Sequence, residues 1–394
     1  MSRILELVGK HDSYRSETLN LQASENILSP NARKALSSDM ASRYSLTLEH
    51  EGYNAYGGAK YMEELLDEVE KLACEVFKSK YSEVRPLGGH IAAEVVLLSL
   101  VDRKRNIMSI SEANGGYTGY QNQYLPQIMG FSNYNIPYDG SKQEILLDDL
   151  ERLLESLMPR LVVLGQSFFV KHYDLRSLRN LCHDHGCKLA YDASHVMGLI
   201  AGEAFQPDVL NYVDVLFGST HKSFFGPQGG IILTNDEEII EAVRRNITWR
   251  AMDNYNPSRL ASLGVAMEEM RQYGKDYARK VVKNSFDLAK SLSNAGLTPR
   301  FSPWFTETHQ ILLSETSLLN LGTNFEGFSN ILERNYIVVD REGRIGTSEI
   351  SRLGIDEVEE IGELIVSALK GNDVSERVKK IRREAKIHYC EVVE

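Results

Sequence analysis

One lysine, Lys222, stands where it could supply a reactive amine. It follows the apolar run 213–217 after four small or polar residues, and Ser223-Phe224-Phe225-Gly226-Pro227 come directly after it. These neighbours predict partial desolvation, which lowers the pKa of a lysine and leaves free amine at neutral pH. A free amine can form an imine with a carbonyl compound. A single lysine after a strand is more often structural or solvated, so this position needs a second observation.

Asp192 provides that observation. It ends the apolar run 188–191, and Lys222 lies 30 positions further on, which leaves room for one crossover helix between parallel strands. A buried carboxylate there would keep a pyridine nitrogen protonated, as pyridoxal phosphate (PLP) requires to accept electrons. His195, three residues beyond Asp192, could orient the ring oxygen of this cofactor or the aspartate. His195 alone would be read as a satisfied core histidine, but together the three residues predict a PLP site.

The segments that carry these residues predict a mostly parallel sheet. Helical spacing of apolar residues, as in 63–77, alternates with short apolar runs at 106–110, 160–164, 188–191, 213–217 and 230–233. This alternation is typical of a sheet covered by helices on both faces.

Four of the apolar runs lead into polar clusters, where ligands bind in such sheets. The clusters are Ser111-Glu112, Gln166-Ser167, 192–195 and 218–222. We predict that they form one site. Four unrelated turns are the alternative, but turn chemistry gives no reason for Asp-x-x-His or His-Lys.

Five segments, in this order, resemble the serine hydroxymethyltransferase family. They are 21–26 (LQASEN), 56–58 (YGG), 192–199 (DASHVMGL), 220–230 (THKSFFGPQGG) and 343–347 (GRIGT). The resemblance covers roughly residues 20–370 and implies an α/β fold: a PLP-dependent fold-type I, aspartate-aminotransferase-like large domain and a smaller α+β C-terminal domain. We place an N-terminal arm at 1–20, the large domain at 21–272 and the small domain at 273–394.

The resemblance also implies roles for individual residues. Lys222 would be the Schiff-base lysine, Asp192 would pair with the pyridine nitrogen, and His195 would contact the ring hydroxyl. Further cofactor contacts would be Ser167, His221 near the phosphate, the phosphate loop Gly88-Gly89-His90, and Tyr117 over the ring, where the family usually has histidine. Arg344 would bind the substrate carboxylate, with Ser24 nearby, because a guanidinium fork suits two oxygens.

A homodimer with shared active sites is a further implication. Tyr44 and Tyr56 would reach across the interface into the partner's site, so a monomer would be catalytically incomplete. The family's catalytic glutamate follows the first tyrosine, and both Glu49 and Glu51 compete for that position. We favour Glu51.

The chain departs from the family pattern in four places. Gly88-Gly89-His90 replaces Ser-Gly-Ser, and Gln228 replaces an arginine. Segment 248–260 lacks the glycine pair of a loop that reaches the neighbouring subunit's phosphate; Arg250 or Arg259 could replace that loop's role. Segment 335–342 lacks the longer loop that helps to hold the pterin. PLP chemistry is therefore expected to be kept, whereas the use of tetrahydrofolate stays open.

The predicted reaction makes or breaks the Cα–Cβ bond of a small β-hydroxy-amino acid. Folate-dependent hydroxymethyl transfer, a threonine-type aldolase and a transaldolase all fit. Another fold-type I reaction, such as transamination or decarboxylation, is one alternative, and a catalytically silent PLP-binding protein is another. Arg344 argues against a silent protein, because such a protein has no use for a clamp on a substrate carboxylate.

Composition excludes several other classes. The net charge of −11 disfavours nucleic-acid binding. Neither a signal-peptide core nor an apolar run long enough to cross a bilayer is found, so no membrane partner is expected. Four cysteines without a paired framework indicate a reducing, cytoplasmic location. Segment 182–187 (CHDHGC) lacks a spaced Cys pair, so it predicts a helix end closed by Gly186 and no metal site.

Overall fold

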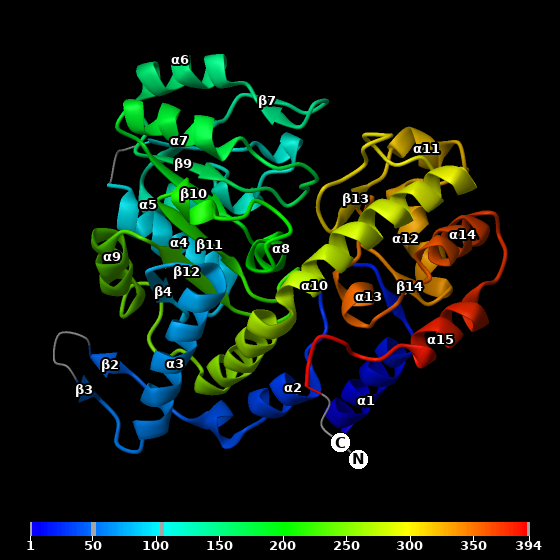
Figure 1. The fold of residues 1–394 in the computed structure, drawn as a ribbon, viewed down its shortest axis with the longest axis horizontal. Coiled ribbons are helices and arrows are strands. Elements are labelled where there is room, and N and C mark those ends of the chain that lie inside the picture. Colours follow the sequence, from blue (N-terminus) through cyan, green and yellow to red (C-terminus); the bar gives the residue numbers. More distant parts are fainter. Residues whose placement is uncertain (1, 49–52, 103–105, 392–394) are drawn as a thin grey trace. The chain divides into compact units, whose positions relative to one another are not determined.

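The computed structural model describes residues 2–48, 53–102 and 106–391 of the 394-residue chain. Its contacts divide them into two compact units. The sheet unit comprises 28–275 with Cys390 and Glu391, and the terminal unit comprises 2–27 with 276–389. The long helix α10 (Pro257–Ala295) runs from the first unit into the second (Figure 1).

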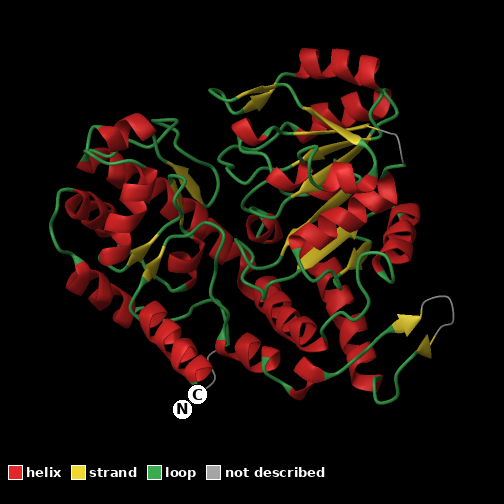
Figure 2. Ribbon diagram, turned by 180° about the vertical axis from the view of Figure 1, so that it is seen from behind, coloured by secondary structure: helices red, strands yellow, loops and turns green. Residues whose placement is uncertain are grey.

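The sheet unit is built on a seven-stranded sheet of order β4-β12-β11-β10-β9-β5-β6. Figure 2 draws the strands in yellow, with helices in red around them. Its strands are β4 (Tyr81–Glu83), β5 (Asn106–Ser109), β6 (Ser132–Asn135), β9 (Leu161–Leu164), β10 (Lys188–Asp192), β11 (Val215–Ser219) and β12 (Gly230–Thr234). All neighbours from β6 to β11 pair in parallel, whereas β12 is antiparallel to both β11 and β4. The mostly parallel sheet predicted from the apolar runs is therefore confirmed.

Helices bury both faces of this sheet. α4 (Gly89–Leu100) and α9 (Glu237–Ile247) pack on each other and on β12, while α7 (Leu175–Asp184) packs on β10 and α6 (Leu147–Leu157) on α7. The other helices are α2 (Pro30–Leu36), α3 (Lys60–Phe77), α5 (Leu125–Met129) and α8 (Met197–Ala201), and the short strands are β2 (Thr47–Leu48), β3 (Tyr53–Asn54), β7 (Tyr138–Asp139) and β8 (Glu144–Ile145). Every residue of β9, β11 and β12 is buried, which explains their continuous apolar sequences.

The terminal unit is a smaller α+β structure with its own core. Its elements are α1 (Arg3–Ser16), β1 (Leu19–Asn20), β13 (Gln310–Leu312), α11 (Glu315–Leu319), α12 (Phe325–Arg334), β14 (Ile337–Val338), β15 (Arg344–Gly346), α13 (Ser348–Arg352), α14 (Val358–Leu369) and α15 (Ser375–Glu384). β1 pairs in parallel with β14, and β13 pairs antiparallel with β15. Leu19 and Leu21 are fully buried in this core. The N-terminal residues therefore pack with the C-terminal part, whereas the limits 1–20, 21–272 and 273–394 stay a prediction.

The described residues contain neither a membrane-spanning helix nor a cluster of metal ligands. No helix among them is long and apolar enough to cross a membrane. Within the same ranges, no group of three or more His, Cys, Asp or Glu side chains is arranged to hold a metal ion. The segment 182–187 closes α7, with Gly186 at φ +66° and the Cys187 amide bonded to the Cys182 carbonyl.

Glu349, a buried carboxyl of the terminal unit, makes stability dependent on pH. Its Oε2 accepts a hydrogen bond of 2.6 Å from Nδ2 of Asn20. Burial raises the pKa of Glu349 against the opposing effects of Asn20 and Arg15. Because the folded-state pKa is raised, the stability that this group contributes is present at low pH and is lost as pH rises through that pKa.

We therefore expect Glu349→Gln, which cannot ionise, to gain stability relative to the unmodified protein as pH rises from about 4 to about 8 in urea unfolding. Glu360→Gln is the opposite control, because hydrogen bonding to Arg377 lowers the pKa of Glu360. Parallel pH curves for Glu349→Gln and the unmodified protein would show that the buried carboxyl has no such effect.

Candidate active site

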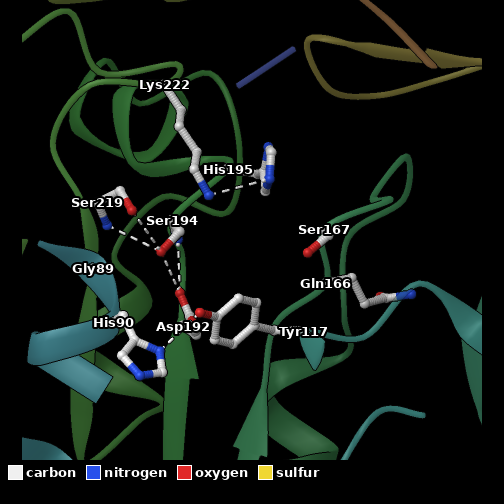
Figure 3. A pocket seen from close by; sticks show the side chains of 10 residues that line it. All are labelled: Gly89, His90, Tyr117, Gln166, Ser167, Asp192, Ser194, His195, Ser219 and Lys222. Carbon is white, nitrogen blue, oxygen red and sulfur yellow. Dashed lines mark hydrogen bonds between the residues drawn. The ribbon is translucent and has the colours of Figure 1, made fainter. Parts of the chain in front are cut away.

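A pocket lies at the carboxyl ends of β9, β10 and β11, beside the first turn of α4 (Figure 3). It offers about 390 Å³ of space not filled by atoms, part of which is open to solvent, and is lined by Gly89, His90, Tyr117, Gln166, Ser167, Asp192, Ser194, His195, Ser219 and Lys222. Three of the four predicted polar clusters thus meet. The prediction for the fourth cluster, Ser111-Glu112, was wrong. The loop after β5 brings Tyr117 to the pocket in place of these two residues. Glu112 accepts a hydrogen bond from Thr118 instead.

The carboxylate of Asp192 is held from both sides. Its Oδ1 accepts hydrogen bonds from the Ser194 amide at 3.1 Å and the Ser194 hydroxyl at 2.6 Å. Its Oδ2 accepts a hydrogen bond from the Tyr120 hydroxyl at 2.8 Å. Burial, with the nearby Asp192 charge, raises the pKa of Tyr120 well above its usual value, so Tyr120 remains a donor. Sequence reasoning missed both partners, although a serine two residues after an aspartate is a common signal of a local turn.

Lys222 and His195 face each other in the pocket. The lysine Nζ lies 3.3 Å from Nε2 of His195, which is only 5% exposed. The next residue, Ser223, accepts a hydrogen bond from the Gly198 amide. A Cβ on Gly198 would lie 2.2 Å from the Ser223 carbonyl oxygen, so only glycine allows the two segments to approach this closely. Close packing of the loops after β10 and β11 therefore sets the position of Lys222.

The first turn of α4 offers a place for an anion. The leading amides of a helix have no partner within the helix, and they attract phosphate. Here the 12-residue α4 begins at Gly89, whose Cβ would lie 2.2 Å from Oγ of Ser219 if it had one. Glycine thus lets β11 end directly against these amides. Gly88, Gly89, His90 and Ser219 form a cradle of the kind that phosphate groups occupy.

Tyr117 connects this cradle to the rest of the pocket. Its hydroxyl lies 2.8 Å from Nδ1 of His90, in a hydrogen bond, and its ring packs edge-on against Tyr120 with centroids 5.3 Å apart. Burial, and then the Asp192 charge, raise the pKa of Tyr117. Tyr117 and His90, which were both predicted to contact the cofactor, therefore lie side by side. The hydrogen bond between them was not predicted from the sequence.

The loop after β9 is fixed to the loop after β5. The Ser167 amide donates a hydrogen bond to the Gly115 carbonyl at 2.6 Å, and Nε2 of Gln166 donates one to the Asn114 carbonyl at 2.6 Å. Tyr173 in turn donates to Oε1 of Gln166 at 2.6 Å. Ser167 therefore has a fixed position at the pocket wall.

The donor set in this pocket fits PLP. Lys222 offers an amine for the aldehyde carbon, Asp192 a carboxylate for the pyridine nitrogen, and Tyr117 an aromatic ring for stacking. The amides of α4 suit the phosphate. His221 lies on the same loop, directly before Lys222. It is not one of the described residues that line the pocket.

The terminal unit holds the predicted carboxylate clamp. Arg344 is 8% exposed, and its Nε donates to Oδ2 of Asp340 at 2.7 Å. The 21–26 segment runs beside it: the Gly346 amide bonds to the Leu21 carbonyl at 2.7 Å, and His309 bonds to the Ala23 carbonyl at 3.1 Å. Ser24 and Arg344 are thus carried by neighbouring backbone segments of the same unit.

The residues predicted to act across a dimer lie apart from the pocket. The Tyr44 hydroxyl donates to Oδ2 of Asp253 at 2.7 Å, and the rings of Tyr44 and Tyr56 are 4.5 Å apart, both exposed. Hydrogen bonding to Asp253 raises the pKa of Tyr44 to about 12. Glu49 and Glu51 lie outside the described residues.

Arg250 and Arg259, the two arginines considered as contacts to the cofactor phosphate of a neighbouring subunit, differ in burial. Arg250 is exposed and bonds to Asn246. Arg259 is buried inside its own sheet unit. It therefore cannot reach a neighbouring subunit, and that suggestion was wrong for Arg259.

Comparisons with known proteins agree with this geometry. A family model described as serine hydroxymethyltransferase matches residues 2–345. The chain is 32% identical to the serine hydroxymethyltransferase of Methanobrevibacter smithii, over 97% of this chain and 94% of that protein. It is also 32% identical to that of Sulfolobus acidocaldarius, with 97% and 91% covered.

A solved structure confirms the fold class. The L-threonine transaldolase from Pseudomonas fluorescens, in its internal aldimine state, superposes with a TM-score of 0.87. The two chains are 24% identical, and the match covers 98% of this chain and 92% of that one. The likeness supports the predicted fold-type I architecture.

The Tyr120 hydroxyl gives the first test of the pocket. Tyr120→Phe leaves Oδ2 of Asp192 without this donor, and hydrogen bonds to charged groups contribute about 1.5–3 kcal/mol. We expect the Kd for PLP, measured by absorbance titration, to rise by about tenfold or more. Tyr134→Phe, on β6, is the matched control and should leave the Kd unchanged. Equal affinities of Tyr120→Phe and the unmodified protein would mean that Asp192 does not act on the cofactor.

Proposed function

Since this chain belongs to the serine hydroxymethyltransferase family, and is therefore a PLP-dependent transferase that makes or breaks the Cα–Cβ bond of a β-hydroxy-amino acid, we propose that this chemistry takes place at Lys222. The observation that carries the proposal is the convergence of Lys222, Asp192 and the first turn of α4 in one pocket. An amine, a doubly held carboxylate and an anion cradle are the three groups that PLP needs.

PLP, when bound, supplies an electron sink for the bond broken at Cα. Lys222 would hold it covalently through Nζ, and His195, 3.3 Å away, orients that amine and would contact the ring hydroxyl. Asp192, fixed by Ser194 and Tyr120, would keep the pyridine nitrogen protonated. The α4 amides, Ser167 and His90 would hold the remaining polar groups of the cofactor, whereas His221, which does not line the pocket, would act through the lysine loop.

Substrate binding falls to the terminal unit. Arg344 would bind the amino-acid carboxylate through its guanidinium edge, with Ser24 beside it. Asp340 accepts from both the Nε and the backbone amide of Arg344, which holds the side chain in one orientation. A planar fork held in this way selects a carboxylate by geometry as well as by charge.

Proton transfer at the β-hydroxyl needs a further group. Breaking the Cα–Cβ bond requires a base for the β-hydroxyl proton. We assign Glu51 and Tyr56 to this role, supplied with Tyr44 by the second copy of a homodimer. Because the pKa of Tyr44 is raised to about 12, its phenol stays protonated and serves as a donor rather than as the base. We further propose that the enzyme acts in the cytoplasm.

The aldehyde acceptor distinguishes the possible reactions. Between α12 and β15 the chain forms only β14, which pairs with β1, and the turn at Asp340. This short path supports our proposal that the pterin contacts of the family are altered. Threonine-type cleavage or transaldol transfer is then as consistent with the residues as hydroxymethyl transfer to tetrahydrofolate.

The main experiment measures glycine formation by PLP-loaded enzyme from L-serine and from L-threonine, each with and without tetrahydrofolate. We expect glycine from at least one substrate, and none from Lys222→Arg, which keeps the charge but loses the imine-forming amine. Serine cleavage that requires the folate would assign hydroxymethyl transfer. Folate-indifferent threonine cleavage would assign an aldolase, or a transaldolase if an added aldehyde is incorporated. Loss of the amino group or carboxylate, or no reaction, would overturn the bond assignment.

Arg344 allows a separate test of substrate binding. Arg344→Lys keeps a positive charge but loses the fork, so we expect KM for the amino acid to rise by about tenfold with a smaller change in kcat. Arg341→Lys, three residues earlier and exposed, is the control and should leave both constants unchanged. An unchanged KM in Arg344→Lys would place the carboxylate elsewhere.

A further inference from the structure

Arg259 is a buried arginine behind the Lys222 loop. It is the third residue of α10 and is 4% exposed. Its Nη2 donates to the backbone carbonyls of Val84 at 2.8 Å and Arg85 at 3.2 Å. Within the described chain, its Nε and Nη1 are buried and have no hydrogen-bond acceptor. Burial lowers its pKa to about 10, so the guanidinium stays charged at neutral pH.

The guanidinium lies between two loops of the pocket. Val84 and Arg85 begin the segment that leads from β4 to Gly88 and Gly89 at the first turn of α4. On the other side, a Cβ on Gly229 would lie 2.5 Å from Nη1 of Arg259. Arg259 therefore touches the segments that carry the anion cradle and the lysine.

Gly229 closes the lysine loop. Its carbonyl accepts a hydrogen bond from the Thr220 amide at 3.1 Å, and the Thr220 hydroxyl donates to the Pro227 carbonyl at 2.7 Å. The next residue, Gly230, donates its amide to the Pro86 carbonyl at 2.8 Å. A shift of Gly229 would consequently move both ends of the loop that presents Lys222.

Among the described residues, no carboxylate pairs with the charge of Arg259 alone. Glu83 is fully buried next to it, but both oxygens of Glu83 bind Arg85, at 2.8 Å to Nε and 2.6 Å to Nη2. An unbalanced buried cation is costly, and that cost falls when an anion binds nearby. The cradle at the first turn of α4 is where such an anion would sit.

We propose that Arg259 is a positioning residue that holds the Lys222 loop against the segment leading to α4 and strengthens phosphate binding at that helix terminus from behind. This inference rests on the proposed function for the identity of the phosphate, which would belong to PLP. Arginine is required because one planar group donates to two carbonyls while its Nη1 lies close to Gly229. The ammonium of lysine is a compact point charge without this shape.

The test compares Arg259→Met, Arg259→Lys and the unmodified holoenzyme. The Kd values for PLP and for unphosphorylated pyridoxal are measured by absorbance titration of enzyme stripped of cofactor, and the Kd for inorganic phosphate is measured directly by titration calorimetry. We expect Arg259→Met to weaken PLP and inorganic phosphate by about tenfold, and to weaken pyridoxal, which is affected only through the displaced Lys222 loop, by several-fold less. Arg259→Lys keeps the charge, so its Kd values for PLP and inorganic phosphate should lie between those of Arg259→Met and the unmodified protein.

The matched control is Arg271→Met, on the same helix. Arg271 is exposed and pairs with Glu75 at 2.8 Å, so its removal should change none of the three affinities. Equal weakening of PLP and pyridoxal by Arg259→Met would overturn the proposal, because a purely structural role predicts that result. Unchanged PLP binding would overturn it as well.

Two safeguards keep the test decisive. If Arg259→Met does not fold, Arg259→Lys decides: weakened phosphate and PLP with a smaller effect on pyridoxal supports the proposal, and equal effects contradict it. If the unmodified protein binds no PLP, the proposed function fails, whereas inorganic phosphate binding by the unmodified protein and both variants still tests Arg259 alone.

Discussion

The parallel pairing of β9, β10 and β11 is the constraint on which the site depends. Residues of β10 lie opposite Leu164 of β9 and Phe217 of β11, so the three strands end at one edge. Strands buried on both faces cannot carry charged side chains within the sheet, because burying an unpaired charge is costly. The polar groups can therefore appear only where the strands end. Asp192 and Lys222, distant in sequence, become neighbours by this geometry alone.

Close backbone contacts then fix the separation between the loops. Gly89, Gly198 and Gly229 each stand where a side chain would collide with a neighbouring segment. These contacts join the loop after β11 to α4, to the loop after β10 and to the start of α10. Close-packed interiors transmit displacement, so substitutions behind the pocket would move the amine of Lys222 as substitutions within it would.

Local sequence patterns were sufficient to predict the strands and the polar residues that follow them. They were insufficient to predict the contacts that depend on long-range packing. The apolar runs predicted β9, β10, β11 and β12, and the polar residues after three of them did converge. Tyr120 could not be found this way, because its bond to Asp192 depends on the path of the loop between β5 and β6. The burial of Arg259 depends on where α10 begins relative to β4. Both features follow from long-range packing, which residue spacing does not encode.

Tyr117 has structural consequences beyond stacking. Tyr117 precedes one short 3-10 turn, Thr118–Tyr120, and Tyr120 ends it, and their hydroxyls bond to different partners. Tyr117 bonds to His90 in the first turn of α4, whereas Tyr120 bonds to Asp192 at the end of β10. A single rigid turn thereby links the anion cradle to the carboxylate. Since neutral phenols do not titrate near neutrality, both hydroxyls keep their protons across the physiological pH range. Tyr117 and Tyr120 thus act as structural connections, because a phenol that keeps its proton does not exchange it near neutrality.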